Sequence, residues 1–297
     1  MNINYELYKV FYNTAKNMSF SKAADSLFVT QSSVSQSIKL LEKQLGISLF
    51  FRNGKRVSLT QSGKILFEHL ETAFTEIIIA ENFIDSYKAI EIGELKIGAS
   101  DTICKHYLLD IFEEFHQKYP KIKLLIDNQP SPKTKHEVLT GQLDLGFINH
   151  DYDNIDPKFN YIDFYTLDEI FFTSNHYKIL KDKILKPDDF KKYPFISLKK
   201  HTSTRNFLED IFSASDLILQ PEVELISVDL IVDLVKAGFG IGFADRKVIQ
   251  DNQSDRLIII KTAFDIPKRK ISLITNKKVP LNQAAKAFIS IAGSHKK

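Results

Sequence analysis

Apolar residues in the first 50 positions recur at helical spacing in three successive segments. The first two segments have inward-facing positions at Leu7, Val10, Phe11 and Ala15, and at Ala23, Ala24 and Leu27. The third has steps of four and three, at Val34, Ile38, Leu41 and Leu45. Thr30 is a favourable N-cap for this last helix, and Gly46 is a left-handed stop at its end. The pattern predicts a three-helix unit of the helix-turn-helix kind.

Two extended segments follow, at residues 48–52 and 56–59, on either side of Asn53-Gly54. An Asn-Gly pair between extended segments is a strong hairpin signal, because both residues of the turn must take positive φ. The hairpin carries Arg52, Lys55 and Arg56, as expected for a wing that contacts DNA. Arg52 could equally brace the wing against the helices, and both roles remain open.

The outward face of the third helix carries short polar groups followed by lysines, at Ser32, Gln36, Lys39 and Lys43. Ser and Gln can bond to base edges, and lysines suit phosphates. Such a face is usually only solvated. Here it coincides with a basic hairpin and with a net charge of +6 over residues 1–64, against −3 for the rest of the chain. We therefore expect this region to bind double-stranded DNA.

The run from Phe20 to Lys64 resembles the DNA-binding domain of LysR-type transcriptional regulators. The matching positions are Phe20, Ala23, Ala24, Leu27, Thr30, Gln31, Val34, Ser35, Ile38, Leu41, Glu42, Leu45, Gly46, Leu49, Phe50, Arg52, Leu59, Thr60 and Gly63. The resemblance extends in domain order and length over the whole chain, with weaker motifs after residue 95. It implies base contacts from Gln31, Ser32, Ser35 and Gln36, and phosphate or minor-groove contacts from Arg52 and Lys55. The full expected DNA-binding set is Ser21, Lys22, Thr30, Gln31, Ser32, Ser33, Ser35, Gln36, Lys39, Arg52, Lys55 and Arg56.

A long helix is predicted over residues 61–89, where neither glycine nor proline occurs after Gly63. Its apolar positions form a coiled-coil seam at Leu66, Leu70, Ala73, Ile77, Ala80, Ile84 and Tyr87. The alternative is a helix packed on its own domain. We favour an intermolecular coiled coil, because a two-fold dimer doubles the contacts with a pseudo-palindromic operator. A homodimer or homotetramer is expected.

Residues 91–297 alternate between strand-like and helix-like segments. A β-α-β-α-β order over residues 94–149 predicts a parallel sheet with helices on both faces, including one helix over residues 102–118. A second set begins with a strand over residues 161–172, contains a helix at residues 187–192, and leads to a last helix at residues 281–292. Crossovers near residues 163–166 and 263–268 would divide the region into two lobes. The resemblance implies a fold like that of periplasmic binding proteins.

The expected fold class is therefore α/β with an all-α N-terminal part. We predict a winged helix-turn-helix domain at residues 1–60 and a linker and dimerisation helix at residues 61–90. An effector-binding domain would occupy residues 91–297. Its lobe I would comprise residues 91–163 and 267–297, and its lobe II residues 164–266.

Small polar residues stand at four predicted strand ends, where such folds bind ligands and helix N-termini offer N–H groups. The predicted effector-binding residues are Ser100, Asp101, Thr102, Pro130, Ser131, Asn149, Thr202 and Ser203, with Ser227 and Val228 from a further loop. Any one of the hydroxyl residues could be an ordinary N-cap. The set favours a small carboxylate or oxyanion. Asp101 would repel an anion unless Lys105, His106 or Arg205 offsets its charge, so a neutral or cationic effector stays open.

Other motifs narrow the function. Gly238, Gly240 and Gly242 have phosphate-loop spacing, but no Lys-Ser/Thr follows and the next residues are strand-like. The single cysteine, Cys104, is spaced with Leu108 and Ile111 for core packing rather than redox sensing. We find no metal-ligand spacing and no catalytic constellation in the sequence, and we expect neither a signal peptide nor a membrane span. We expect no enzyme activity, no cofactor besides an effector, no membrane partner and a cytoplasmic location.

The sequence thus predicts a sequence-specific DNA-binding transcriptional regulator, modulated by a small-molecule effector in the inter-lobe cleft, with RNA polymerase as a further partner. An architectural DNA-binding protein with a non-ligand-binding oligomerisation domain is the alternative. An enzyme with an accessory DNA-binding head is a third hypothesis, but the sequence offers no catalytic group for it.

Overall fold

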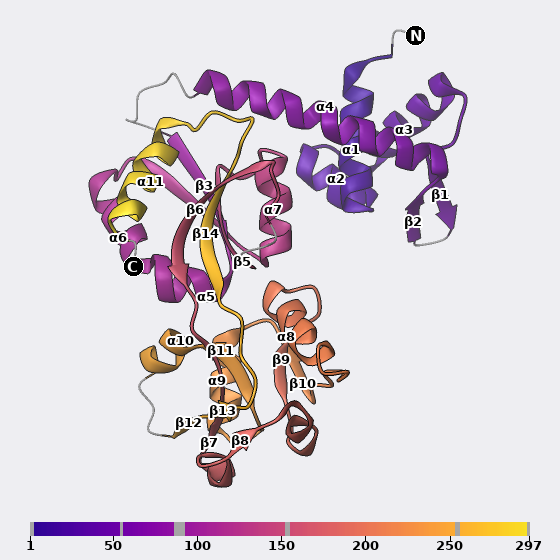
Figure 1. Cartoon of the computed structure of the whole chain (residues 1–297). Helices are drawn as coiled ribbons and strands as arrows, with labels where there is room; N and C mark the ends of the chain where they lie inside the picture. Colours follow the sequence, from indigo (N-terminus) through magenta and orange to yellow (C-terminus); the bar gives the residue numbers. More distant parts are fainter. Residues whose placement is uncertain (1–2, 54–55, 86–92, 152–154, 253–255, 296–297) are drawn as a thin grey trace. The chain divides into compact units, whose positions relative to one another are not determined.

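The computed structural model describes residues 3–53, 56–85, 93–151, 155–252 and 256–295 (Figure 1). The chain divides into two compact units, Met1–Ala80 and Glu81–Lys297. Each unit buries hydrophobic side chains of its own. In the described part of the chain, no helix is both long and apolar enough to cross a membrane.

The N-terminal unit is built on three short helices, α1 (Tyr5–Asn17), α2 (Phe20–Leu27) and α3 (Gln31–Leu45). Their buried faces meet in one core, which confirms the predicted stripes at Leu7, Phe11, Ala15, Ala23, Ala24, Val34, Ile38 and Leu41. The Thr30 hydroxyl accepts the Ser33 N–H at 3.2 Å, and Gly46 ends α3 with a φ of 72°. Both predicted ends of α3 are therefore confirmed.

The predicted wing is confirmed as an antiparallel pair, β1 (Phe50–Asn53) and β2 (Arg56–Leu59). Asn53, predicted to be part of the turn, pairs with Arg56 and so belongs to β1. Residues 54–55, which join the strands, lie outside the described residues. Phe50 is buried in the helical core and pairs with Leu59, so a buried hydrophobic position contributes to the strand register.

The predicted long helix is α4 (Gln61–Asp85), and the last predicted residues, 86–89, lie outside the described part. The seam prediction is wrong for its first turns, where Leu66 and Leu70 pack against the N-terminal core. Phe67 stacks on Tyr12 at 5.5 Å between ring centroids, and Phe74 contacts the same ring at 4.8 Å. The alternative of intramolecular packing therefore holds there.

Farther along α4 the seam faces solvent. Ala73 and Ala80 are exposed, and Ile77 is 41% exposed. The side chain of Ile84 and the whole of Tyr87 fall outside the described residues. A partner helix thus has an apolar stripe available only beyond the first three turns of α4.

Phe28, in the turn between α2 and α3, holds an unfavourable backbone conformation. Its φ is 55°, and its side chain is 96% exposed. A left-handed conformation costs a residue other than glycine roughly 1–2 kcal/mol, and Asn tolerates it better. We expect Phe28→Asn to raise the free energy of unfolding by about 1 kcal/mol, since no buried contact is lost. Thermal unfolding of the full chain measures this, and Val29→Asn, without a positive φ, is the control that should give no gain.

Lobe I of the second unit is a five-stranded sheet of order β4-β3-β5-β14-β6. As predicted, β3 (Gly93–Ala99) pairs in parallel with both β4 (Ile122–Asn128) and β5 (Leu145–Asp151). The returning strand β14 (Arg269–Asn276) lies antiparallel between β5 and β6 (Phe159–Thr166). One face packs against α6 (Leu109–Lys118) and α11 (Gln283–Ser294), and the other against α7 (Ser131–Leu139). Helices on both faces are therefore confirmed.

The single helix predicted over residues 102–118 is interrupted. A short α5 (Asp101–Ile103) passes into a π-helical turn, η1 (Cys104–Leu108), before α6 begins. Such turns widen the helix and are frequent at functional sites. Here His106 and Tyr107, both in the π turn, bond to carboxylates of lobe II. The irregularity places two lobe I side chains against the second lobe.

Lobe II has β7 (Glu169–Ser174) at the centre of an antiparallel sheet, between β11 (Gly242–Asp245) and β12 (Leu257–Ile259). Two parallel pairs accompany it: β9 (Ile196–Leu198) with β10 (Val223–Leu225), and β8 (Ile184–Leu185) with β13 (Lys261–Thr262). The helical segments are α8 (Ser203–Ser213), α9 (Val228–Lys236), α10 (Arg246–Asp251), and the 3-10 turns η2 (Asn175–Leu180) and η3 (Pro187–Lys192). The helix predicted at residues 187–192 is confirmed and is of the 3-10 type.

The single strand predicted over residues 161–172 is wrong. It is two strands, β6 and β7, which belong to the sheets of different lobes. The chain changes lobe at Leu167-Asp168, slightly later than expected, and returns between Thr262 and Arg269 as expected. Leu167 donates its N–H to the Arg269 carbonyl at 2.9 Å, so the two crossovers are bonded to each other. Apolar residues lie on both sides of the crossover, so the periodicity of the sequence does not show where one strand ends and the next begins.

The glycines near the end of α9 serve close backbone packing. Gly238 and Gly240 have φ values of 90° and 145°. A Cβ at Gly240 would lie 2.2 Å from the Pro194 carbonyl oxygen, so only glycine fits. A strand, β11, follows them rather than a helix.

Candidate functional site

The predicted DNA-facing residues of the two helices lie mostly at the surface. Ser21 and Lys22 on α2 are exposed, as are Gln31, Ser32, Ser33, Gln36 and Lys39 on α3, while Ser35 is half-buried. Thr30 is the N-cap residue of α3, and its hydroxyl lies 2.8 Å from the hydroxyls of Ser32 and Ser33. The wing side chains of Arg52, Lys55 and Arg56 lie outside the described residues.

Glu42 and Thr60 attach the wing to the helices. A carboxylate oxygen of Glu42, on α3, accepts the backbone N–H groups of Leu49 at 2.8 Å and Phe50 at 3.3 Å. Thr60 donates its hydroxyl to the Ser48 carbonyl at 2.8 Å and accepts the Gly63 N–H at 3.0 Å. Side-chain hydrogen bonds therefore attach both ends of the wing to the helices. They fix the position of the basic hairpin relative to the polar face of α3.

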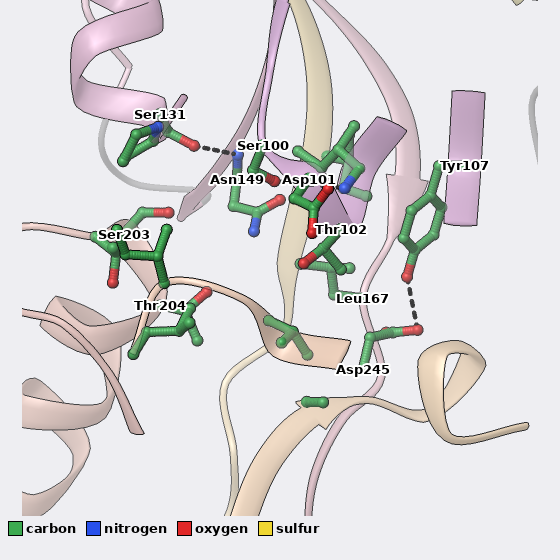
Figure 2. Close-up of a pocket in the computed structure, with 18 of the residues that line it drawn as sticks. Ser100, Asp101, Thr102, Tyr107, Ser131, Asn149, Leu167, Ser203, Thr204 and Asp245 are labelled. Carbon is green, nitrogen blue, oxygen red and sulfur yellow. Dashed lines mark hydrogen bonds between the residues drawn. The ribbon is translucent and has the colours of Figure 1, made fainter. Parts of the chain in front are cut away.

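A cavity of about 110 Å³ lies between the two lobes (Figure 2). One water needs roughly 10–15 Å³ on this measure, so a small organic molecule has room. The cavity brings together nine of the ten predicted effector-binding residues, namely Ser100, Asp101, Thr102, Pro130, Ser131, Asn149, Thr202, Ser203 and Val228. Ser227 is not in the lining, but it donates to Asp101 Oδ2 at 3.4 Å.

Three of these residues also have the capping role that the sequence left open. The hydroxyls of Ser100, Thr202 and Ser227 accept N–H groups at the starts of α5, α8 and α9. Ser131 acts differently, because its hydroxyl accepts the Asn149 N–H at 3.1 Å and so joins α7 to β5. A residue can cap a helix and line the cavity at the same time, because the helix N-terminus lies at the strand end that borders the cavity.

A buried ion pair lies at the crossovers. Arg269, the first residue of β14, donates to both carboxylate oxygens of Glu169, the first residue of β7, at 2.7 and 2.5 Å. Their side chains are 1% and 5% exposed. Arg269 also donates to Thr204 Oγ1 at 3.0 Å and lies over the Phe207 ring at 4.2 Å. Glu169 and Thr204 line the cavity, so the hinge and the cavity wall share these groups.

Tyr107 of lobe I and Asp245 of lobe II both line the cavity and are joined by a hydrogen bond (Figure 2). The Tyr107 hydroxyl donates to Asp245 at 2.8 Å, and Asp245 also accepts the N–H groups of Asp168 and Lys247. Burial raises the pKa of the Asp245 carboxyl, although these donors oppose the shift. Burial, with the nearby Asp245 charge, also raises the pKa of Tyr107. The phenol is therefore the donor in this inter-lobe bond.

The three basic residues that could offset Asp101 each form an ion pair with another carboxylate. Lys105 pairs with Asp229 at 2.8 Å. His106 lies between Asp229 at 3.2 Å and Asp251 at 2.8 Å, which are lobe II carboxylates outside the cavity. Arg205 is buried and pairs with Glu209 and Glu224, and none of the three lines the cavity. Among the described residues these three basic groups pair with other carboxylates, which favours the neutral or cationic effector that the sequence left open.

Cys104 is half-buried against the lobe I core. Burial, with a contribution from the Asp101 charge, raises the pKa of its thiol to about 11. A thiol of this kind is a poor nucleophile at neutral pH, which agrees with the predicted packing role. Within the described residues, no group of three or more His, Cys, Asp or Glu side chains is placed to hold a metal ion.

Several lining residues were missed by the sequence interpretation: Tyr107, Asn128, Gln129, Leu167, Glu169, Leu198, Thr204, Ile226, Phe243 and Asp245. The ends of β4 and β11 could have indicated Asn128, Gln129 and Asp245 by the strand-end rule. Tyr107 comes from the π turn and Leu167 from the crossover, and neither has a local sequence signal.

A winged helix-turn-helix unit joined to a two-lobed α/β unit with a cavity at its hinge defines a class of ligand-responsive DNA-binding proteins. Family models match both parts: the bacterial regulatory helix-turn-helix of the lysR family at residues 5–64, and the LysR substrate binding domain at residues 89–297. The chain belongs to the LysR family of transcriptional regulators.

Relatives and solved structures agree with this assignment. A protein of Trichormus variabilis named "Probable RuBisCO transcriptional regulator" is 29% identical over 276 residues, which are 91% of this chain and 82% of the relative. Full-length OxyR from Pseudomonas aeruginosa is 17% identical with a TM-score of 0.66, covering 99% of this chain and 95% of OxyR. A structure described as full-length CbnR complexed with its target DNA has 16% identity and a TM-score of 0.53, over 99% of this chain and all of that one (100%). At these identities the structures establish the fold.

Proposed function

We propose that a small molecule bound in the inter-lobe cavity modulates DNA binding or activation by this regulator. The observation that carries the proposal is the position of the cavity. Its wall is built from both lobes and includes Glu169, half of the buried pair at the crossovers. A ligand that binds one lobe arrangement more tightly than another must shift the population towards it. Coupling to the DNA-binding unit then follows as a difference in affinity between the two states.

The chain is proposed to act as a homodimer or homotetramer on a pseudo-palindromic operator. The support is the exposed stripe of Ala73, Ile77 and Ala80 on α4, which a second copy of the helix would cover. The CbnR structure, described as a complex with target DNA, is a precedent for DNA binding by this fold. RNA polymerase is the proposed further partner, and a role in transcription would place the protein in the cytoplasm. No catalytic activity is proposed.

The second candidate is an architectural DNA-binding protein whose body only oligomerises. Thermal unfolding of the full chain with a panel of metabolites separates the two functions, because a ligand of the native state must raise the apparent stability by mass action. A metabolite that raises the unfolding temperature and changes operator affinity supports the regulator. A panel that changes neither supports the architectural role.

Gln36, exposed on α3, is expected to contact a base edge. Gln36→Ala should weaken operator binding by roughly 5- to 150-fold, the range of about 1–3 kcal/mol per bidentate contact, with little change for random DNA. Lys39→Ala is the matched variant one helical step away. It should weaken both DNAs similarly and lower the salt slope by about one. Equal losses on both DNAs for Gln36→Ala would exclude base reading there.

A further inference from the structure

The inter-lobe cavity is acidic. Three carboxylates line it, from Asp101, Glu169 and Asp245, and its described lining contains no Lys, Arg or His. Two of the three are satisfied within the protein: Glu169 pairs with Arg269, and Asp245 accepts three hydrogen bonds. A polyanion such as a phosphate ester would enter this cavity without a cation on the wall to neutralise it.

Asp101 is the carboxylate for which no ion pair is found among the described residues, although its charge contributes, after the hydrogen bond to Asp229, to the raised pKa of Lys105. Its oxygens accept from Asn128 Nδ2 at 3.1 Å and from Ser227 Oγ at 3.4 Å, both neutral donors. Among the described residues no cationic side chain forms an ion pair with it, and Lys105, the basic residue next to it in the π turn, is paired with Asp229. A partly buried carboxylate with two neutral donors can take a further, charge-assisted hydrogen bond from an ammonium group.

The opposite end of the cavity offers donors. Figure 2 shows the hydroxyls of Ser131, Ser203 and Thr204 on the other side of the cavity from Tyr107 and Asp245. Ser131 and Thr204 each accept a hydrogen bond, from Asn149 N–H and from Arg269, so each hydroxyl proton can be donated to a ligand. Ser203 Oγ has no partner among the described residues and stands in the first turn of α8. Helix N-termini and hydroxyl protons together suit a carboxylate.

Asn149 lies between the two ends (Figure 2). Its Oδ1 atom is buried and has no hydrogen-bond partner in the described structure. A buried acceptor without a donor destabilises the unliganded protein. A ligand N–H group close to Asp101 would remove that cost.

We propose that the effector is a small zwitterion of the α-amino acid type. Its ammonium group donates to Asp101 and Asn149, and its carboxylate accepts from the hydroxyls of Ser131, Ser203 and Thr204. Its side chain meets the apolar part of the wall, which includes Leu167, Ile226, Val228 and Phe243. The inference rests on the proposed effector role of the cavity and names the ligand class for it.

The test is thermal unfolding of the full chain with matched triplets. Each triplet consists of an L-amino acid with an apolar side chain, the amine that lacks the carboxylate, and the acid that lacks the amine. We expect at least one amino acid to raise the unfolding temperature, with a dissociation constant at least tenfold lower than that of its amine or its acid. Asp101→Asn should weaken the binding of that amino acid at least tenfold. Asp110 is an exposed carboxylate on α6, and Asp110→Asn should leave the binding unchanged.

Ser203→Ala tests the carboxylate end of the site, as Asp101→Asn tests the ammonium end. Ser203→Ala should weaken the binding of the amino acid and of its acid but not that of the amine. The unfolding temperatures without ligand show whether each variant is folded. If an acid or a phosphate ester stabilises the protein and still does so in Asp101→Asn, the proposal of a zwitterionic effector is wrong. The proposed function as a ligand-responsive regulator would then still hold. No stabilisation by any amino acid also overturns it. Operator binding, measured in parallel, tests the DNA-binding function separately.

Discussion

Replacing Arg269 with methionine is expected to destabilise the unit Glu81–Lys297 by about 3–5 kcal/mol, because the Glu169 carboxylate would stay buried without its counter-charge. The loss is at the high end for a single substitution, since Arg269 also bonds to Thr204 and packs on Phe207. For a unit of this size, the unfolding temperature should fall by roughly 6–20 °C. Calorimetry of the full chain measures this transition.

The double variant Glu169→Leu/Arg269→Met is the control for that argument. With both charges removed, no buried ion is left uncompensated, and a hydrophobic replacement of a buried pair is often neutral or stabilising. We expect the double variant to recover more than half of the loss. If it is as unstable as Arg269→Met alone, then packing at Phe207, rather than the unpaired charge, is the dominant cost.

The pair also explains how the hinge is connected to the cavity. Glu169 forms part of the wall, and the Arg269 guanidinium holds the Thr204 hydroxyl that we assign to the ligand carboxylate. A change in lobe orientation at the crossovers would therefore move groups that line the cavity and that we propose to contact the ligand. This is the differential contact that a ligand needs in order to shift a two-state equilibrium.

Elements with strong local signals were predictable from the sequence. The α3 helix has a cap, a stop and a regular buried stripe, and the structure places all three as expected. The parallel strands of lobe I follow from alternation of strand and helix. Nine cavity residues were found because the strand-end rule depends on topology alone, which the sequence order determines.

Features that depend on packing between distant segments were not predictable. Leu66 and Leu70 have the spacing of the predicted α4 seam, but in the structure they pack against the N-terminal core. Tyr5 and Tyr12 of α1 also contact aromatic residues of α4, so this part of the helix packs within its own unit. The pairing of Glu169 with Arg269 joins residues 100 positions apart. The sequence also does not show the pairing of Arg205 with Glu224, although its pairing with Glu209, four residues on in the same helix, follows a local pattern. Charge complementarity at that range has no local pattern.

Gly63, at the start of α4, is expected to be intolerant of even a methyl group. A Cβ there would lie 2.2 Å from the Leu49 carbonyl oxygen and 3.1 Å from a Leu59 methyl carbon, one at the entry and one at the exit of the wing. That oxygen also accepts the Thr60 N–H at 2.9 Å, so it cannot move without breaking the bond that closes the wing. This contact gives a physical reason for glycine at the end of the Leu59-Thr60 motif.

We therefore expect Gly63→Ala to cost about 3 kcal/mol of stability, the upper part of the range for overpacking, and to weaken operator binding because the wing is displaced. Gly293→Ala is the matched control, since Gly293 is also helical but has nothing within 4 Å of a Cβ. It should gain up to about 1 kcal/mol from helix propensity and bind DNA normally. Thermal unfolding and operator titration of both variants decide the point. A Gly63→Ala protein with unchanged stability and affinity would show that the wing moves freely against α4.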